Sequence, residues 1–380
     1  MRKALLFLLL AAILTCGACK SQTDNAANVN DVKSATASKP AGMRAFYASH
    51  SLMWDMPPVL TEDANAYGIK GHTVLGIQSL GVSRTSAHWD LPDAQNQAKQ
   101  ALKAGNVDAF VMSPIGMPDP AIESFVKLGL EHNPKMKFYV QISWPGMGLV
   151  DNDDMESMMG GRGGGMGGRG GATGGRGGAA PGAAAGNVPG AAIGAAPGAG
   201  GIGGGMMGGG MMGGGRGGMG GGMMGGGQNY NKTPEEIAKI NVKNNKSAED
   251  QAKKINEEVG RTVVYLIPSA QAHNALRTMI YNKEMPGMTD QGEVFRDSIG
   301  HPTVPVIALN AYLHFAVMYG VSPVGLPQPD IFINPPASIR AGWKDEWKDP
   351  KLNAKLQELA WKIVSNYPQS GVKAPAEKKK

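Results

Sequence analysis

Short apolar runs alternate with longer amphipathic segments along two stretches of this chain. Five of the runs are rich in Val, Ile, Phe and Tyr, are bounded by turn residues, and lie at Arg44–Ala48, Thr73–Ile77, Asp108–Met112, Lys137–Ser143 and Thr262–Ile267. Runs of this length and composition predict five β-strands.

Helix signals fill the intervals between these strands. The pair Asp119-Pro120 precedes an apolar-periodic segment that ends near Asn133. The run Thr233-Pro234-Glu235-Glu236 offers an N-cap, a proline at the first helical position and a capping-box glutamate. The last segments, Val304–Tyr319 and Leu352–Val364, are also predicted to be helices.

Strands that alternate with helices in this way predict an α/β protein. We expect a three-layer α/β/α, flavodoxin-like fold with a five-stranded parallel sheet, wrapped by helices on both faces. Ligands of such sheets bind at the carboxyl ends of the strands. The loops that follow the strands are therefore the places to look for chemistry.

A glycine-rich segment interrupts the pattern. Of the 56 glycines among 380 residues, 37 lie between Gly160 and Gly227, a segment with no acidic and no aromatic residue. Such a composition cannot offset the backbone entropy lost on folding, so residues 160–227 are predicted to be a disordered insert. The rest of the pattern forms a single domain made of residues 43–150 and 228–370, followed by a basic tail at 371–380.

The formal net charge of +6 does not describe the predicted domain. Four positive charges are arginines of the glycine-rich insert, and two are Arg2 and Lys3 at the N-terminus. The remainder nets to zero, so we expect no nucleic-acid partner and no basic surface for anionic lipid. The methionine pairs of the insert could bind soft Cu(I) through their thioethers, which leaves a metal-scavenging insert open as an alternative.

The N-terminus has the pattern of an export signal. Arg2 and Lys3 precede an apolar run, Ala4–Leu14, that is too short to span a bilayer but suits a signal peptide over residues 1–18. Residues 19–42 carry scarcely a large apolar side chain and are predicted to be a flexible tether.

Both cysteines of the chain lie at this end. The run Thr15-Cys16-Gly17-Ala18-Cys19 resembles a bacterial lipobox, in which small residues precede a cysteine that is lipidated and becomes the new N-terminus. We therefore expect Cys19 to be the lipidation site and the protein to be anchored in the cell envelope, at the membrane periphery. Cleavage after Ala18 by an ordinary signal peptidase, without a lipid, is the alternative. In either case the folded domain contains no disulfide.

Two segments on the expected carboxyl edge of the sheet carry complementary chemistry. Ser51 follows the first strand, where free backbone N–H groups at the mouth of a helix can stabilise an oxyanion. Asp297 and His301 lie close together before the predicted helix at Val304. A serine hydroxyl needs a base to remove its proton, and an imidazole base needs a partner that fixes its tautomer. These three residue types therefore belong together.

With these residues the chain resembles the SGNH (GDSL-type) hydrolase superfamily, esterases and lipases that place their serine early and their Asp and His late. Ser51 falls on the nucleophile of that superfamily, Gly81 on its oxyanion glycine, and Asp297 with His301 on its final block. The resemblance implies a serine esterase without a cofactor that hydrolyses a small acyl ester. An acetyl group on an extracellular carbohydrate would be a substrate of this kind.

The chain departs from the superfamily pattern in three blocks. The first block has Ser49-His50-Ser51 in place of Gly-Asp-Ser, the last separates Asp297 from His301 by three residues rather than two, and Met112-Ser113-Pro114 lacks an asparagine. That asparagine donates a hydrogen bond to the oxyanion, a contact worth ~3 kcal/mol in comparable sites. Its absence favours a rival prediction, a catalytically impaired SGNH-like binding domain at the cell surface.

The candidate residues also have purely structural interpretations. Ser51 could be a helix N-cap, His301 a helix-entry residue and Asp297 a capping acid. Three tryptophans in or near loops after strands could stack on sugar rings or be partly buried in the ordinary way: Trp54, Trp89 and Trp144. The other histidines show no ligand spacing, so no metal site is expected. An alternative from a different functional class is that the insert is an adhesive segment and that the α/β domain is its structural carrier.

The lipidation hypothesis predicts that the mature chain partitions with membranes and with detergent. Cys19→Ala should release the protein into the soluble fraction, because the thiol that carries the lipid is removed. Cys16→Leu, which restores the aliphatic residue usual at that position, should stay in the membrane fraction. Membrane retention of the Cys19→Ala variant, or a mature N-terminus at another residue, would contradict lipidation.

Overall fold

The computed structural model describes residues 39–146, 151, 230–297, 299–336 and 347–373. The predicted signal peptide, the predicted lipidation site Cys19, the glycine-rich insert and most of the predicted tether and basic tail lie outside these residues. The described residues from Pro40 onward belong to one compact unit.

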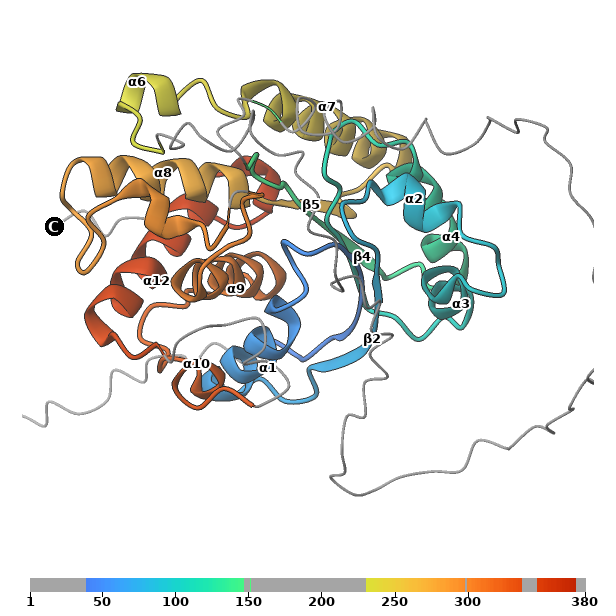
Figure 1. The fold of residues 1–380 in the computed structure, drawn as a ribbon. Coiled ribbons are helices and arrows are strands. Elements are labelled where there is room, and N and C mark those ends of the chain that lie inside the picture. Colours follow the sequence, from blue (N-terminus) through green and yellow to red (C-terminus); the bar gives the residue numbers. More distant parts are fainter. Residues whose placement is uncertain (1–38, 147–150, 152–229, 298, 337–346, 374–380) are drawn as a thin grey trace, which may run out of the picture. The chain divides into compact units, whose positions relative to one another are not determined.

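Five parallel strands form a single sheet in this unit (Figure 1). They are β1 (Arg44–Ser49), β2 (Thr73–Ser79), β3 (Ala109–Met112), β4 (Lys137–Gln141) and β5 (Val264–Ile267). The strand order is β2-β1-β3-β4-β5, which is the order of a flavodoxin-like doubly wound sheet. The predicted fold class is therefore confirmed.

Helices cover both faces of the sheet. One face packs against α1 (Met56–Tyr67), α8 (Ser269–Tyr281), α9 (Val304–Tyr319) and α12 (Pro350–Ser365). The other face packs against α3 (Gln97–Lys103), α4 (Ala121–His132) and α7 (Val242–Val259). The shorter elements are α2 (Thr85–Trp89), α6 (Pro234–Ile237), α10 (Asp330–Ile333), η1 (Gln291–Val294) and η2 (Pro368–Ser370).

α9 is the central helix of its layer. All of its residues from Val306 to Tyr319 are buried, and it packs against both α1 and α12. A helix that is apolar all round belongs in the interior, which explains why its sequence lacks a polar face. Because α9 begins directly after the predicted Asp297–His301 segment, its packing determines where that segment lies.

The predicted capping box at Thr233 is present. Glu236 N–H donates to the Thr233 hydroxyl oxygen at 3.3 Å, and Thr233 N–H donates to the Glu236 carboxylate at 2.8 Å. The helix it opens, α6, ends at Ile237, and Asn241 with φ of 65° separates it from α7. None of the described helices combines the length and apolar character needed to cross a bilayer.

Asp63 is a buried carboxyl group on α1. Its side chain is 1% exposed, and neither carboxyl oxygen has a hydrogen-bond partner within the described part of the chain. Burial, together with the nearby charge of Glu62, raises the pKa of Asp63 well above its usual value. Asp63 thus folds as a neutral acid. The free energy of unfolding therefore falls as the pH rises from about 3.9, the pKa of an aspartate in the unfolded chain, to the raised pKa of Asp63 in the folded protein.

Asp63→Asn should remove this pH dependence, because the amide stays neutral. We expect a higher thermal midpoint than wild type at pH 7.5, by ~2–4 °C for each kcal/mol of relieved destabilisation, and a smaller gain near pH 4. Thermal unfolding followed by circular dichroism at both pH values measures the difference. Asp90→Asn, at an exposed aspartate, is the control and should show no pH-dependent rise in the thermal midpoint. If Asp63→Asn raised the thermal midpoint equally at both pH values, Asp63 would not be a neutral buried acid.

Candidate active site

Polar residues gather where the strands of the sheet end. Ser49 ends β1 and His50 follows it, Ser113 follows β3, Ser143 comes two residues after β4, and Ser269 starts α8 just beyond β5. All five are at most 3% exposed. Because the strands are parallel, their carboxyl ends meet at one edge of the sheet. A buried polar layer therefore lines the edge at which the candidate residues were predicted.

Asp297 and His301 form a hydrogen-bonded pair in the loop between η1 and α9. His301 Nδ1 lies 2.6 Å from Asp297 Oδ2. Asp297 Oδ1 accepts hydrogen bonds from the backbone N–H groups of Ile299, Gly300 and His301, each at 3.1 Å. The loop thus wraps around the carboxylate, which orients the imidazole through Nδ1. His301 Nε2 has no hydrogen-bond partner among the described residues, as a general base requires.

The Asp297 carboxylate is stabilised in its charged form. Burial opposes its ionisation, but the hydrogen bonds from the side chain and backbone of His301 and from Ile299 N–H outweigh burial and hold its pKa below the usual value. The ionised Asp297 stabilises the folded protein fully when the pH is above about 3.9, the pKa of an aspartate in the unfolded chain. This contribution to the free energy of unfolding is lost as the pH falls through the lowered pKa of Asp297 in the folded protein. Asp297 is therefore a negative partner for His301 throughout the neutral range.

Ser51 lies in a turn that precedes α1. Met53 N–H donates to the His50 carbonyl oxygen at 2.9 Å, and the N-cap of α1 is Asp55. The prediction that Ser51 stands at the mouth of a helix is therefore wrong, because the helix begins four residues later. The interpretation of Ser51 as a helix N-cap is wrong for the same reason. Asp297 and His301 do not cap α9 either, because the N-cap of that helix is Thr303.

Two features hold the Ser51 turn beside the loop of Asp297 and His301. Arg296 Nη1 and Asp55 Oδ2 form an ion pair at 3.8 Å that joins the two segments. Ser51 and Pro302, the residue after His301, also line one small cavity. The structure thus brings the three candidate residues to the same part of the sheet edge. No hydrogen bond joins Ser51 to His301 in the part of the chain that the structure describes.

Gly81 lies in the loop after β2. Leu80 N–H donates to the Ser49 carbonyl oxygen at 3.0 Å, which places the start of this loop beside the end of β1. Gly81 is exposed, and a Cβ atom on it would meet no heavy atom within 4 Å. Neither Ser51 N–H nor Gly81 N–H donates a hydrogen bond to another described residue. Both groups are available to a ligand.

A second imidazole, His50, lies at the end of β1, where the sequence pattern assigned it no role. Its Nδ1 accepts a hydrogen bond from Leu52 N–H at 3.3 Å, so Nε2 carries the proton. Nε2 lies 3.1 Å from Ser113 Oγ and 3.3 Å from Ser143 Oγ. Gln141 Nε2 also donates to Ser113 Oγ, at 3.3 Å. Ser113, which stands where the superfamily has its asparagine, is therefore part of a buried network.

The buried imidazoles at this edge are neutral. Burial, with smaller contributions from His88 and His301, lowers the pKa of His50 to about 3. Burial also lowers the pKa of His88 to about 4, and its two ring nitrogens lie 3.1 Å from Gln78 Nε2 and Ser83 Oγ. Both are poor bases at neutral pH. The environment of the His301 side chain is different: it is 17% exposed and is paired with a carboxylate.

Trp144 supports the loop of Asp297 and His301 from the β4 side. Its indole Nε1 donates to the Gly300 carbonyl oxygen at 3.0 Å, and its ring stacks on His273 with centroids 3.7 Å apart. Gly146 approaches the same loop so closely that a Cβ atom on it would collide with the Ile299 carbonyl. The backbone that carries His301 is thus fixed by direct packing.

The three tryptophans singled out from the sequence have different environments. Trp144 is 2% exposed and is a packing residue. Trp89 is half-buried against Phe125, with ring centroids 4.9 Å apart. Trp54, three residues after Ser51, is 41% exposed. Of the three, Trp54 is the one with a free ring surface beside the candidate site.

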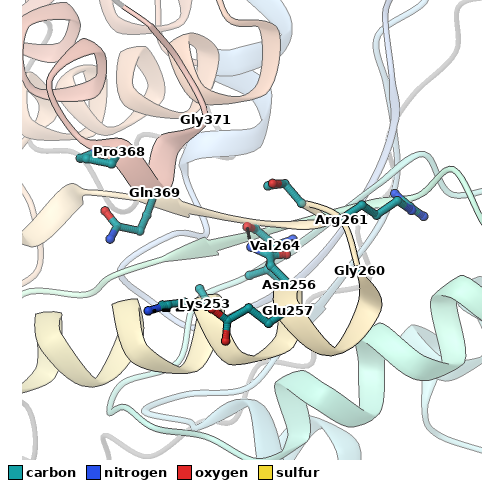
Figure 2. A pocket seen from close by; sticks show the side chains of 11 residues that line it. Lys253, Asn256, Glu257, Gly260, Arg261, Val264, Pro368, Gln369 and Gly371 are labelled. Atoms are coloured by element: carbon teal, nitrogen blue, oxygen red, sulfur yellow. Dashed lines mark hydrogen bonds and ion pairs between the residues drawn. The ribbon is translucent and has the colours of Figure 1, made fainter.

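No metal or cofactor is expected from the sequence, and the described residues contain no group of three or more His, Cys, Asp or Glu side chains placed to hold a metal ion. A groove of about 600 Å³ lies at the opposite edge of the sheet, where β5 begins (Figure 2). Lys253, Glu257 and Arg261 line it, together with Gln369, and its lining contains no histidine or cysteine. It therefore contains no serine and histidine pair of the kind that lies at the carboxyl edge.

Trp144→Phe should loosen the loop that carries His301, because Phe lacks the N–H that binds the Gly300 carbonyl. We expect a shift of the His301 ring resonances in NMR spectra and a loss of ~1 kcal/mol in the free energy of unfolding beyond that of the control. Trp89→Phe, with the same change in ring size, is that control. His301 resonances that stay in place in the Trp144→Phe protein would contradict the supporting role.

Comparisons with known proteins give one structural similarity. No protein-family model matches this chain, and no curated protein matches it. The structure is similar to the crystal structure of a DUF4886 family protein from Bacteroides uniformis ATCC 8492, with a TM-score of 0.46 and 13% sequence identity, over 86% of this chain and 96% of that chain. A similarity of this degree does not assign the chain to that family.

Proposed function

We propose that this protein is a serine esterase of SGNH type that hydrolyses a small acyl ester. Ser51 is the nucleophile, His301 the general base and Asp297 the residue that orients the imidazole. One observation carries the proposal: the 2.6 Å hydrogen bond between His301 and Asp297, which leaves Nε2 unpaired on a loop that is ion-paired to the Ser51 turn.

The reaction follows from these roles. His301 Nε2 takes the proton of the Ser51 hydroxyl as Oγ forms a bond to the acyl carbon. The tetrahedral intermediate then expels the alkoxide, which receives that proton from His301 and leaves as an alcohol. Water, deprotonated by the same nitrogen, attacks the acyl-serine and releases a carboxylic acid. Because no described residue holds the Ser51 side chain by a hydrogen bond, its hydroxyl can turn towards Nε2 when substrate binds.

Two backbone N–H groups support stabilisation of the oxyanion. Those of Ser51 and Gly81 make no hydrogen bond to another described residue, and the space in front of Gly81 is open. The superfamily adds an asparagine side chain, but here the corresponding Ser113 hydroxyl is bound to His50, Ser143 and Gln141. We therefore expect a slower enzyme than one with three donors, since each donor is worth ~3–4 kcal/mol of transition-state stabilisation.

The alcohol part of the ester is proposed to be a carbohydrate outside the cytoplasm. The exposed ring of Trp54 lies close to Ser51 in the sequence and offers a stacking surface for a sugar. The predicted signal peptide and lipidation at Cys19 would place the protein in the cell envelope, where acetylated polysaccharides are accessible.

A non-catalytic SGNH-like binding domain is the second candidate. The observation in its favour is that Ser113 is committed to a buried network and that Ser51 and His301 are not hydrogen-bonded to each other. In that case the same edge of the sheet would bind a sugar ester without cleaving it.

The esterase proposal predicts turnover of p-nitrophenyl acetate and of acetylated sugars, and labelling of Ser51 by a phosphonate probe. Ser51→Ala should lower kcat/KM by at least ~10³-fold with little loss of stability. His301→Ala should be nearly as damaging, and the double variant no worse than either, because the two residues act as a unit. Asp297→Asn should have a comparable or milder effect.

Ser247→Ala, a serine on α7 that lines a separate groove with Pro118 and Asp250, is the matched control and should keep full activity and remain unlabelled. Undiminished hydrolysis by the Ser51→Ala protein would refute the mechanism. A wild-type protein that binds acetylated sugars but does not cleave them would establish the binding-domain alternative instead.

A further inference from the structure

A small cavity opens beside Ser51, between the start of α1 and α9. Its apolar wall comes from Leu52, Met56, Pro302 and Ile307. The space open to the centre of a water-sized sphere is about 10 Å³, which corresponds to about one water molecule. The cavity is therefore large enough for one small group and too small for a chain.

Besides Ser51 and Asp55, the cavity has a third polar lining residue, Asn310 on α9. It is 2% exposed, and neither its Nδ2 nor its Oδ1 has a hydrogen-bond partner among the residues that the structure describes. Its backbone carbonyl is occupied by His314 Nδ1, at 2.8 Å, so only the side-chain amide is unpaired. A buried amide without partners is costly and is therefore rare, unless water or a ligand supplies the missing hydrogen bonds.

We propose that this cavity is the acyl pocket of the esterase and that Asn310 selects a two-carbon acyl group with a hydroxyl on its second carbon, a glycolyl group. The proposal rests on the proposed function, because it takes Ser51 as the nucleophile. It adds the identity of the acyl group and a specificity residue that lies outside the Ser51, His301 and Asp297 set.

The size and chemistry of the cavity match this group. In this assignment the carbonyl carbon is bound at Ser51 Oγ, and the second carbon of the acyl group points into the cavity that Ser51 lines together with Met56 and Pro302. The terminal hydroxyl then takes the space of about one water molecule, where it can both donate to Asn310 Oδ1 and accept from Nδ2. A site built to bind a hydroxyl discriminates strongly against an analogue that lacks it, because its polar group is then left unpaired.

Other small acyl groups fit less well. The terminal methyl of a propionyl group has the size of the hydroxyl but would bury the Asn310 amide against an apolar surface. A butyryl group exceeds the space of one water molecule. A group with a terminal carboxylate, such as malonyl, would bring a negative charge to a cavity that Asp55 also lines. An acetyl group fits but leaves Asn310 without its partner.

Hydrolysis of four esters that share one alcohol tests the assignment. For the wild type we expect kcat/KM to be at least tenfold higher for the glycolyl ester than for the propionyl ester, with acetyl between them and butyryl lowest. Asn310→Leu, which has a similar volume, should reverse the glycolyl and propionyl order, and Asn310→Ala should admit butyryl. Asn282→Leu, an exposed asparagine at the end of α8, is the control and should keep the wild-type order.

A binding measurement separates this inference from the esterase proposal. Glycolamide, titrated into the wild type, should shift the Asn310 side-chain amide signals in NMR spectra more than propionamide does, and it should have no such preference in Asn310→Leu. If no ester is cleaved but glycolamide binds in this way, the esterase proposal fails and the pocket stands. Equal rates for glycolyl and propionyl esters, or equal effects of the two amides, would overturn the pocket assignment.

Discussion

The position of β1 between β2 and β3 is the constraint on which the rest of this site depends. The chain leaves β1 to form β2 on one side and then crosses to form β3 on the other. The loops that follow β1 and β3 therefore run in opposite directions, the arrangement at which sheets of this order bind ligands. Ser51 follows β1 at this point, and the loop with Asp297 and His301 lies beside it because α9 packs directly against α1.

Much of the fold follows from local sequence signals. The helix Val304–Tyr319 was predicted at its observed limits, since Pro305 favours its first turn and Gly320, with φ of 69°, ends it. The limits of β2, β4 and β5 were predicted less well. β2 continues two residues past the predicted end at Ile77, whereas the predicted runs for β4 and β5 extend two residues beyond the strands, after Gln141 and before Val264. A run of hydrophobic residues indicates a strand, but the ends of the strand also depend on where the hydrogen bonds to the neighbouring strand stop.

The candidate site was predictable where its residues are close in sequence. Asp297 and His301 are four positions apart, so their types and spacing were enough to suggest a pair. The hydrogen bonds of His50 to Ser113 and Ser143 join residues 63 and 93 positions apart. They exist because β1, β3 and β4 are neighbours in that order, which no local pattern discloses. A polar residue just after each of three strands was the signal that could have suggested this network.

The strand order also bears on how the chain folds. When β3 pairs with β4, Ala109 lies beside Lys137, which is 28 positions later in the chain. When β4 pairs with β5, Phe138 lies beside Val264, which is 126 positions later. The longer closure costs roughly 1.3 kcal/mol more in chain entropy. The sheet is therefore expected to grow outward from β1, β3 and β4, with β5 joining late. Until β5 arrives, β4 is an apolar edge strand, and a chain that folds slowly at this step exposes Phe138, Tyr139 and Val140 to aggregation.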